Sequence, residues 1–153
     1  MRCIGIDWGE RRIGLSYGDE IGVATPLPAI IIDDKTARLA ELVKQVERKR
    51  ITDIVIGYPY NMNGSIGFKA KEVDAFIEEL SKLVTVPIHR IDERLTSHEV
   101  KQYLGNKRDD ELRRSGKIDS ASATLILQDY LSQNVSLPEY DPYGDDEDWE
   151  DES

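Results

Sequence analysis

Four acidic residues stand where regular elements of the chain are expected to end or begin. Asp7 closes the first apolar run, Asp92 and Glu93 close a later one, and Asp119 opens the last helical stretch. Ligands gather beyond the carboxyl ends of strands in an open sheet, so Asp7 and one of the later pair can meet if their strands run the same way. Each acid also has a structural interpretation, because aspartate suits turns and helix N-termini.

The chemistry of such a cluster follows from its charge. Three carboxylates that converge without a basic partner repel one another unless a cation lies between them. Hard oxygen ligands favour Mg²⁺ or Mn²⁺, which share their coordination sphere with water and substrate phosphate. We therefore expect metal-assisted phosphodiester hydrolysis, in which the ions lower the pKa of a water and stabilise the leaving oxygen. No histidine base is needed, and His89 and His98 are interpreted as packing and surface residues.

The elements that must position these acids begin with a hairpin. Apolar runs over residues 2–7 and 12–18 are joined by the short connection "WGER", which predicts two antiparallel strands. A third strand is expected over about 21–32, where Pro26 and Pro28 place it at a sheet edge.

Strand alternation places Cys3, Gly5 and Asp7 on one face of the first strand. Small residues beneath the Asp7 carboxylate would let a helix or another backbone approach closely. The single cysteine rules out an internal disulfide framework, and Cys3 is interpreted as a small core residue rather than a nucleophile.

The rest of the chain alternates between helix and strand. The pattern predicts helices over 34–49, over about 70–83, from the Thr96 capping box with Glu99, and from Asp119, with strands in "TDIVIGYP" and "VPIHRI". This order predicts an α/β fold with a mixed five-stranded sheet and helices on both faces.

Length and charge bound the domain organisation. The 153 residues suit one domain, expected over 1–138. The last fifteen residues, 139–153, hold nine acids and no Lys or Arg, and we expect them to form a disordered tail. The net charge of −10 therefore reflects the tail, because residues 1–138 carry 20 basic and 21 acidic side chains. A nucleic-acid partner is not excluded.

No signal peptide and no apolar stretch of membrane-spanning length is visible in the sequence. The expected location is the cytoplasm.

Four stretches, in this order, are "GIDWGERRIGLSYGD", "IVIGYPYNMNGSIG", "IDERLTSHEV" and "GKIDSASATLILQDYL". They resemble the YqgF family, also called RuvX, whose members are assigned as pre-16S rRNA nucleases with a ribonuclease H-like fold related to RuvC-type Holliday junction resolvases. The resemblance implies that Asp7, Glu93 and Asp119 are the catalytic, metal-binding acids. Glu93 matches the acid of the family's DER block, although alternation alone leaves Asp92 and Glu93 open.

Two tyrosines, Tyr58 and Tyr60, replace leucines of the family's "GLPLNMDG" stretch. They either pack in the core or offer stacking faces to unpaired bases.

Basic residues flank the expected acidic site in the sequence, and at least two of them are predicted to contact phosphates of a nucleic acid. Arginine forks suit this task because they bind phosphate oxygens in pairs. The candidates are Arg11, Arg12, Arg94, Arg113, Arg114 and Lys117, with Lys107 and Arg108 nearby.

The resulting hypothesis is a metal-dependent endonuclease that processes the 5′ end of pre-16S ribosomal RNA. The alternatives are a Holliday junction resolvase acting on branched DNA and a non-catalytic RNA-binding ribosome-assembly factor. Actin-like ATPases and sugar kinases also open on an "IGIDxG" hairpin, but they need two such domains to close over ATP. Because 153 residues supply one domain, this alternative requires a partner subunit. A monomer or a homodimer is compatible with the sequence, and a symmetric resolvase requires the dimer.

Overall fold

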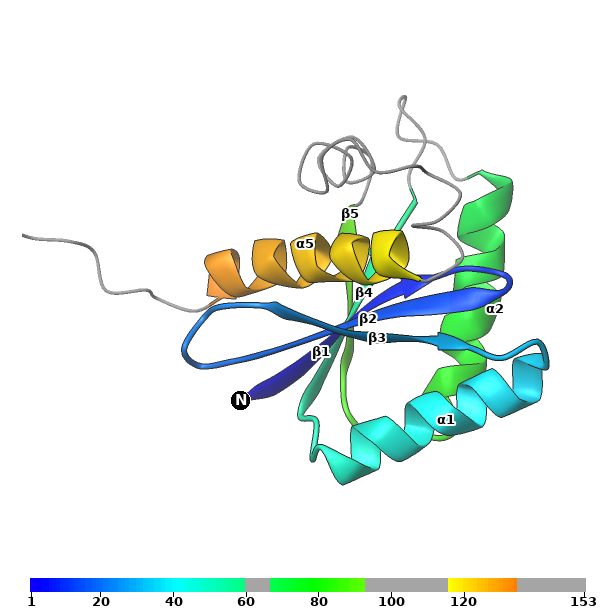
Figure 1. The fold of residues 1–153 in the computed structure, drawn as a ribbon, viewed down its shortest axis with the longest axis horizontal. Coiled ribbons are helices and arrows are strands. Elements are labelled where there is room, and N and C mark those ends of the chain that lie inside the picture. The colour runs from blue at the N-terminus through cyan, green and yellow to red at the C-terminus, as the bar shows by residue number, and fades with distance from the viewer. Residues whose placement is uncertain (60–66, 93–115, 135–153) are drawn as a thin grey trace, which may run out of the picture.

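A computed structural model of the chain describes residues 1–59, 67–92 and 116–134 (Figure 1). Its strands are β1 (Arg2–Trp8), β2 (Arg12–Asp19), β3 (Thr25–Ile31), β4 (Asp53–Tyr58) and β5 (Ile88–Asp92), and its helices are α1 (Lys35–Arg48), α2 (Phe68–Ser81) and α5 (Lys117–Asn134). These elements confirm the predicted ones to within a few residues. The helix expected from Thr96 and the tail over 139–153 lie outside the described residues.

The five strands form one mixed sheet in the order β3-β2-β1-β4-β5. The pairs β1–β2 and β2–β3 are antiparallel, whereas β4 is parallel to both β1 and β5. Strand β3 therefore lies at an edge, as its prolines predicted. Strands β1, β4 and β5 run the same way, so their carboxyl ends lie at one end of the sheet.

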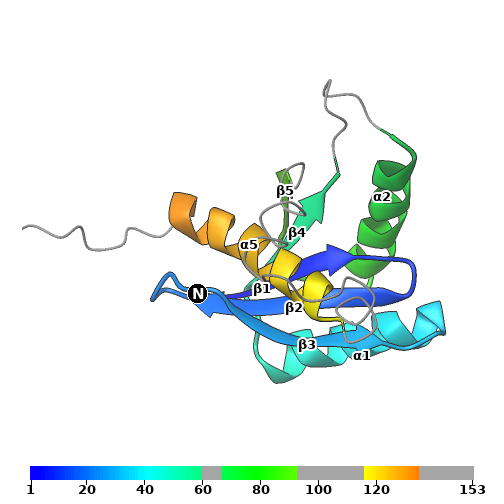
Figure 2. The same ribbon diagram turned by 45° about the horizontal axis from the view of Figure 1, so that its top comes forward.

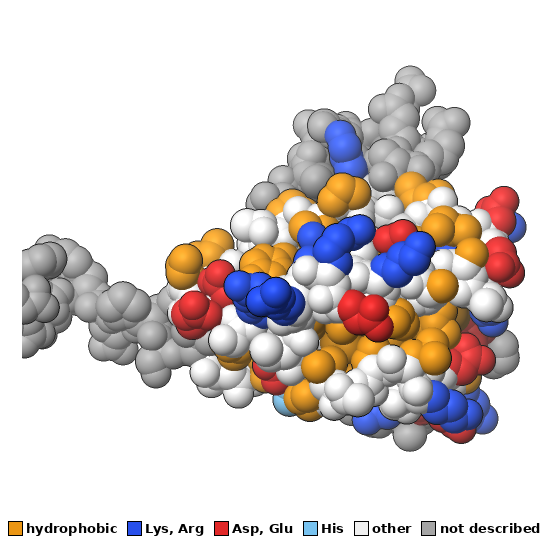
Figure 3. Space-filling model, turned by 90° about the horizontal axis from the view of Figure 1, so that it is seen from below, with side chains coloured by type: hydrophobic (Ala, Val, Ile, Leu, Met, Phe, Trp, Pro, Cys, Tyr) orange, Lys and Arg blue, Asp and Glu red, His pale blue; other side chains and the backbone are white. Residues whose placement is uncertain are grey.

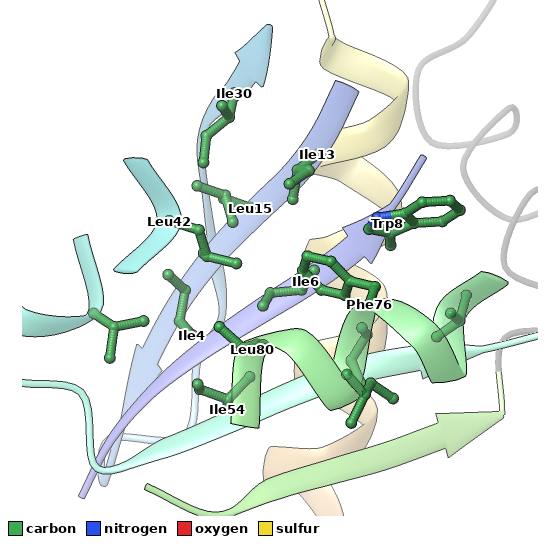
Figure 4. Close-up of a cluster of buried hydrophobic side chains, with 14 of the residues drawn as sticks. Ile4, Ile6, Trp8, Ile13, Leu15, Ile30, Leu42, Ile54, Phe76 and Leu80 are labelled. Carbon is green, nitrogen blue, oxygen red and sulfur yellow. The ribbon is translucent and has the colours of Figure 1, made fainter. Parts of the chain in front are cut away.

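Helices cover both faces of the sheet: α1 and α2 lie on one side and α5 on the other (Figures 1 and 2). The α1/α2 face holds the larger core, in which aliphatic and aromatic side chains of the strands meet those of the two helices (Figure 4). Labelled members are Ile4, Ile6, Trp8, Ile13, Leu15, Ile30, Leu42, Ile54, Phe76 and Leu80.

The opposite face of β1 and β2 is built from small residues that α5 approaches closely. A Cβ added to Gly5 would lie 2.8 Å from the carbonyl oxygen of Ala123, and one added to Gly14 would lie 2.0 Å from that of Asp119. Between them, the buried Ser16 hydroxyl donates a hydrogen bond of 2.7 Å to the Ala123 carbonyl. The prediction that small residues admit a helix on this face is confirmed.

Charged side chains of both signs are intermixed with hydrophobic ones on the surface seen from below in Figure 1 (Figure 3). This mixture agrees with the near balance of basic and acidic residues over 1–138. In the part of the chain that the structure describes, no helix is both long and apolar enough to cross a membrane.

Candidate active site

Asp7 and Asp119 lie beside the same glycine. Asp7 in β1 is the cross-strand partner of Gly14 in β2, and the backbone of Asp119 in the first turn of α5 rests on Gly14. Directly opposed residues of an antiparallel pair point to the same face, so the Asp7 side chain lies on the α5 side of the sheet. The fold thus brings together two acids that lie far apart in the sequence.

Asp92 lies on the other face. It is aligned with Tyr58 of β4, whose side chain is buried in the core beneath α1 and α2. Aligned residues on neighbouring strands share a face, so Asp92 points away from the side that holds Asp7. Glu93, the alternative that the sequence left open, lies outside the described residues.

Tyr58 takes the packing role. Only 4% of its surface is exposed, and its hydroxyl donates a hydrogen bond of 2.8 Å to Asp74 of α2. The guanidinium of Arg90 lies 5.5 Å from the centroid of the tyrosine ring and 3.4 Å from Asp74. A buried ring covered in this way is not a stacking face for a base, and Tyr60 lies outside the described residues.

A basic partner for Asp119 corrects one expectation. The sequence suggested acids without such a partner, but the Arg12 Nε donates to the Asp119 carboxylate over 3.0 Å. The pairing arises because the first turn of α5 packs on β2, and Arg12 is the first residue of that strand. About a quarter of each side chain is exposed, so solvent reaches this ion pair.

A cleft of about 440 Å³ opens beside this ion pair. Its walls come from the end of β1, the β1–β2 turn, the start of β2, the first two turns of α2 and the first turn of α5. The lining residues are Trp8, Gly9, Glu10, Arg11, Arg12, Lys69, Glu72 and Asp119. Arg11, Arg12 and Lys69 give the cleft three cationic side chains, and Glu10, Glu72 and Asp119 give it three acidic ones. A lining of both signs can contact phosphate groups through its cations and a metal ion through its acids.

Lys69 is the residue of this cleft that sequence reasoning missed. No motif marks it, but α2 follows β4, and a helix that follows a parallel strand begins at the carboxyl end of the sheet. That rule could have found Lys69. Lys117, by contrast, lines a different groove, between α5 and β3, and is not brought to this cleft. Arg94, Arg113 and Arg114 lie outside the described residues.

The donor set at Gly14 suits a hard divalent cation. Mg²⁺ in proteins is commonly held by one or two carboxylates, with water and substrate phosphate completing the sphere. Asp7 and Asp119 supply two such groups. Over residues 1–59, 67–92 and 116–134, no group of three or more His, Cys, Asp or Glu side chains could hold a metal ion. The third predicted acid, Glu93, is outside those ranges.

A second polar cluster lies at the opposite end of the same face. His89 Nε2 lies 3.1 Å from the Asp53 carboxylate, and the His89 ring lies 4.9 Å, centroid to centroid, from that of Tyr130 in α5. Burial, together with the charge of Asp53, raises the pKa of the Cys3 thiol to about 11. These contacts confirm the interpretation of His89 as a packing residue and of Cys3 as an unreactive core residue.

Comparison with known proteins identifies the family. The sequence profile of RuvX, described as Holliday junction resolvase, matches residues 1–133. The chain belongs to the RuvX family.

Curated relatives of this RuvX chain cover nearly its whole length. A protein of Opitutus terrae is 49% identical over 90% of this chain and 96% of its own, and one of Crocosphaera subtropica is 38% identical over 87% and 94%. Both are named "Putative pre-16S rRNA nuclease". The RuvX match ends at residue 133, so the acidic tail lies beyond it.

Solved structures establish the fold. Thermus thermophilus RuvC in complex with a Holliday junction substrate superposes with a TM-score of 0.55 at 14% identity, over 90% of this chain and 98% of that one. Fowlpox virus resolvase with its Holliday junction gives 0.52 at 11% identity, over 89% and 100%. The RuvX chain therefore has the ribonuclease H-like fold, as the sequence resemblance implied.

Proposed function

We propose that this RuvX chain is a metal-dependent endonuclease that hydrolyses phosphodiester bonds at the 5′ end of pre-16S rRNA, in the cytoplasm. The observation that carries the proposal is the placement of Asp7 and Asp119 beside Gly14, next to a cleft lined by Arg11, Arg12 and Lys69. Relatives up to 49% identical are named for this activity, which supports the substrate.

Asp7 and Asp119 would hold Mg²⁺ or Mn²⁺ through their carboxylate oxygens. When bound, such an ion supplies Lewis acidity toward the phosphate and an activated water. We propose Glu93 as the third acid, because Asp92 lies on the wrong face of the sheet. Arg12 offsets the charge of Asp119 and so lets two carboxylates lie close together before substrate arrives.

Phosphate groups of the substrate would contact the cationic side chains of the cleft. Arg11 and Arg12 offer planar guanidinium groups that suit paired phosphate contacts, and Lys69 adds a point charge from α2. Arg94, Arg113 and Arg114 stay proposed contacts, and Lys117 stays one outside this cleft, because it lines the groove between α5 and β3. Contacts of this kind position the strand and carry little sequence information.

The test is cleavage of an end-labelled pre-16S rRNA precursor by the Asp7→Asn and Asp119→Asn variants in Mg²⁺ or Mn²⁺. Each substitution removes a charge while keeping the side-chain shape, so we expect cleavage to fall roughly 100-fold or more. Asp53→Asn is the matched control, because the Asp53 carboxylate also contacts a side-chain nitrogen, has a side-chain exposure of 22% against 23% for Asp119, and lies at the other end of the face. It should cleave like the wild type.

Equal cleavage by wild type, Asp7→Asn and Asp119→Asn would point to a contaminating nuclease and overturn the proposal. A panel that adds a branched DNA junction identifies the substrate. Cleavage of the junction without cleavage of the precursor would replace the rRNA by DNA, and binding of RNA without any product would leave an assembly factor.

A further inference from the structure

Arg38 is a buried cation that the proposed reaction does not use. It lies in the first turn of α1, and only 3% of its surface is exposed. A buried charge is costly unless its hydrogen-bonding groups find partners. Among the described residues, the partners of this guanidinium are backbone carbonyls: Nη1 donates to Ile32 over 2.6 Å and to Asp33 over 3.0 Å, and Nη2 donates to Glu10 over 2.5 Å.

These carbonyls belong to two separate segments. Ile32 and Asp33 lie in the connection from β3 to α1, whereas Glu10 lies in the turn between β1 and β2. The guanidinium therefore joins the start of α1 to the β1–β2 turn. The described peptide bonds are trans, and in a trans peptide the C=O and the N–H point in opposite directions. The Glu10 carbonyl points toward Arg38, so the N–H of Arg11 points away from it.

The turn that Arg38 holds forms one wall of the cleft beside Asp119. Gly9, Glu10 and Arg11 all line that cleft. Arg38 lines a smaller cavity of about 70 Å³ together with Trp8 and Glu72, and these two residues also line the cleft. Arg38 thus lies behind the wall that the nucleic acid would face.

We propose that Arg38 is a positioning residue, which fixes the β1–β2 turn against α1 and so sets where Arg11 and Arg12 meet the phosphates of a bound nucleic acid. The ligand in this inference rests on the proposed function. The planar fork of an arginine can serve three carbonyls in two segments, whereas a lysine places its donors around a single nitrogen. The role of Arg38 therefore depends on the geometry of the fork rather than on its charge.

The substitution Arg38→Lys tests this assignment, because it keeps the charge and removes the fork. We expect amide hydrogen exchange over residues 9–12 to become about tenfold faster while exchange in β4 and α5 stays unchanged. The Kd for a labelled single-stranded RNA, measured without divalent metal, should rise about fivefold, and kcat at saturating RNA should change less than about twofold. Arg48→Lys, at an exposed residue in the last turn of α1, is the matched control and should change none of these.

Two results for the Arg38→Lys protein would overturn the inference. One is an Arg38→Lys protein whose exchange over residues 9–12 and RNA affinity equal those of the wild type. The other is faster exchange throughout β4 and α5, which would show a general loss of stability instead of a displaced turn. A wild type that binds RNA without cleaving it overturns the nuclease activity alone, because Arg38→Lys still weakens binding if the inference holds. A wild type that binds no RNA overturns both.

Discussion

The two faces of the sheet are built from alternate residues of the same strands, yet they differ in kind. Toward α1 and α2, β1 presents Ile4, Ile6 and Trp8, which interlock with large side chains of the helices (Figure 4). Toward α5, it presents Cys3, Gly5 and Asp7, and the helix lies almost directly on the backbone.

This difference separates stability from function. The α1/α2 face buries large apolar side chains, which supply most of the hydrophobic stabilisation. The α5 face gives up side-chain volume at Gly14, and the first turn of α5 then lies beside Asp7. Small residues therefore position the proposed site by letting α5 approach the sheet closely. The large side chains on the opposite face stabilise that sheet.

The strongest challenge to this comparison adds a methyl group to the α5 face. In Gly14→Ala, the new Cβ would overlap the backbone of Asp119, which cannot rotate away as a side chain can. We expect the free energy of unfolding to fall by about 3 kcal/mol or more. Urea denaturation measures it. A folded Gly14→Ala protein with wild-type cleavage would contradict the role of Gly14 in positioning Asp119.

The pH dependence of stability tests how tightly the α5 face is closed at Cys3. Its folded-state pKa of about 11 lies above the ordinary thiol value of 9.0, so the buried thiol stabilises the fold below pH 9 and this contribution is lost as the pH rises toward 11. The loss is about 2 kcal/mol by pH 11. In Cys3→Ala it should be absent. Unfolding curves of both proteins at pH 8 and pH 11 measure it, and parallel declines would indicate an open face.

Removing a methylene group from the α1/α2 face should cost less and leave the site intact. Ile6 is fully buried in the larger core, and Ile6→Val should lower the free energy of unfolding by about 1 kcal/mol. Cleavage should stay at the wild-type level because the α5 face is unchanged. A large loss of activity in this variant would show that the two faces do not divide their tasks.

The smallest expected effect on stability belongs to the ion pair on the α5 face. Arg12→Gln breaks a partly exposed contact to Asp119 and should lower the free energy of unfolding by about 0.5 kcal/mol. The same change should weaken RNA binding and reduce its salt dependence, since one phosphate-facing charge is lost. Unchanged affinity across a salt titration would remove Arg12 from the proposed interface.

Much of the fold was predictable because its signals are local. The spacing around "WGER" predicted the hairpin, Pro26 and Pro28 predicted an edge strand, and the alternation at Cys3, Gly5 and Asp7 predicted a face that a helix could approach. Periodicity likewise predicted α1, α2 and α5. The disorder expected for the tail stays a prediction.

The site was less predictable because its contacts join distant parts of the chain. The pairing of Arg12 with Asp119 depends on where α5 crosses β2, and the face of Asp92 depends on how β5 aligns with β4. Neither is encoded in a short window. Arg38 likewise occupies an ordinary position in a helix, and only the packing of α1 beneath the β1–β2 turn reveals its partners.

Binding of Mn²⁺ to the protein without nucleic acid, followed by electron paramagnetic resonance, tests most directly whether the α5 face brings two acids to one metal. We predict that Asp7→Asn and Asp119→Asn each weaken Mn²⁺ binding at least about tenfold, since each removes a ligand. Asp53→Asn should bind like the wild type. Equal Mn²⁺ affinity in the wild type and all three variants would contradict the account.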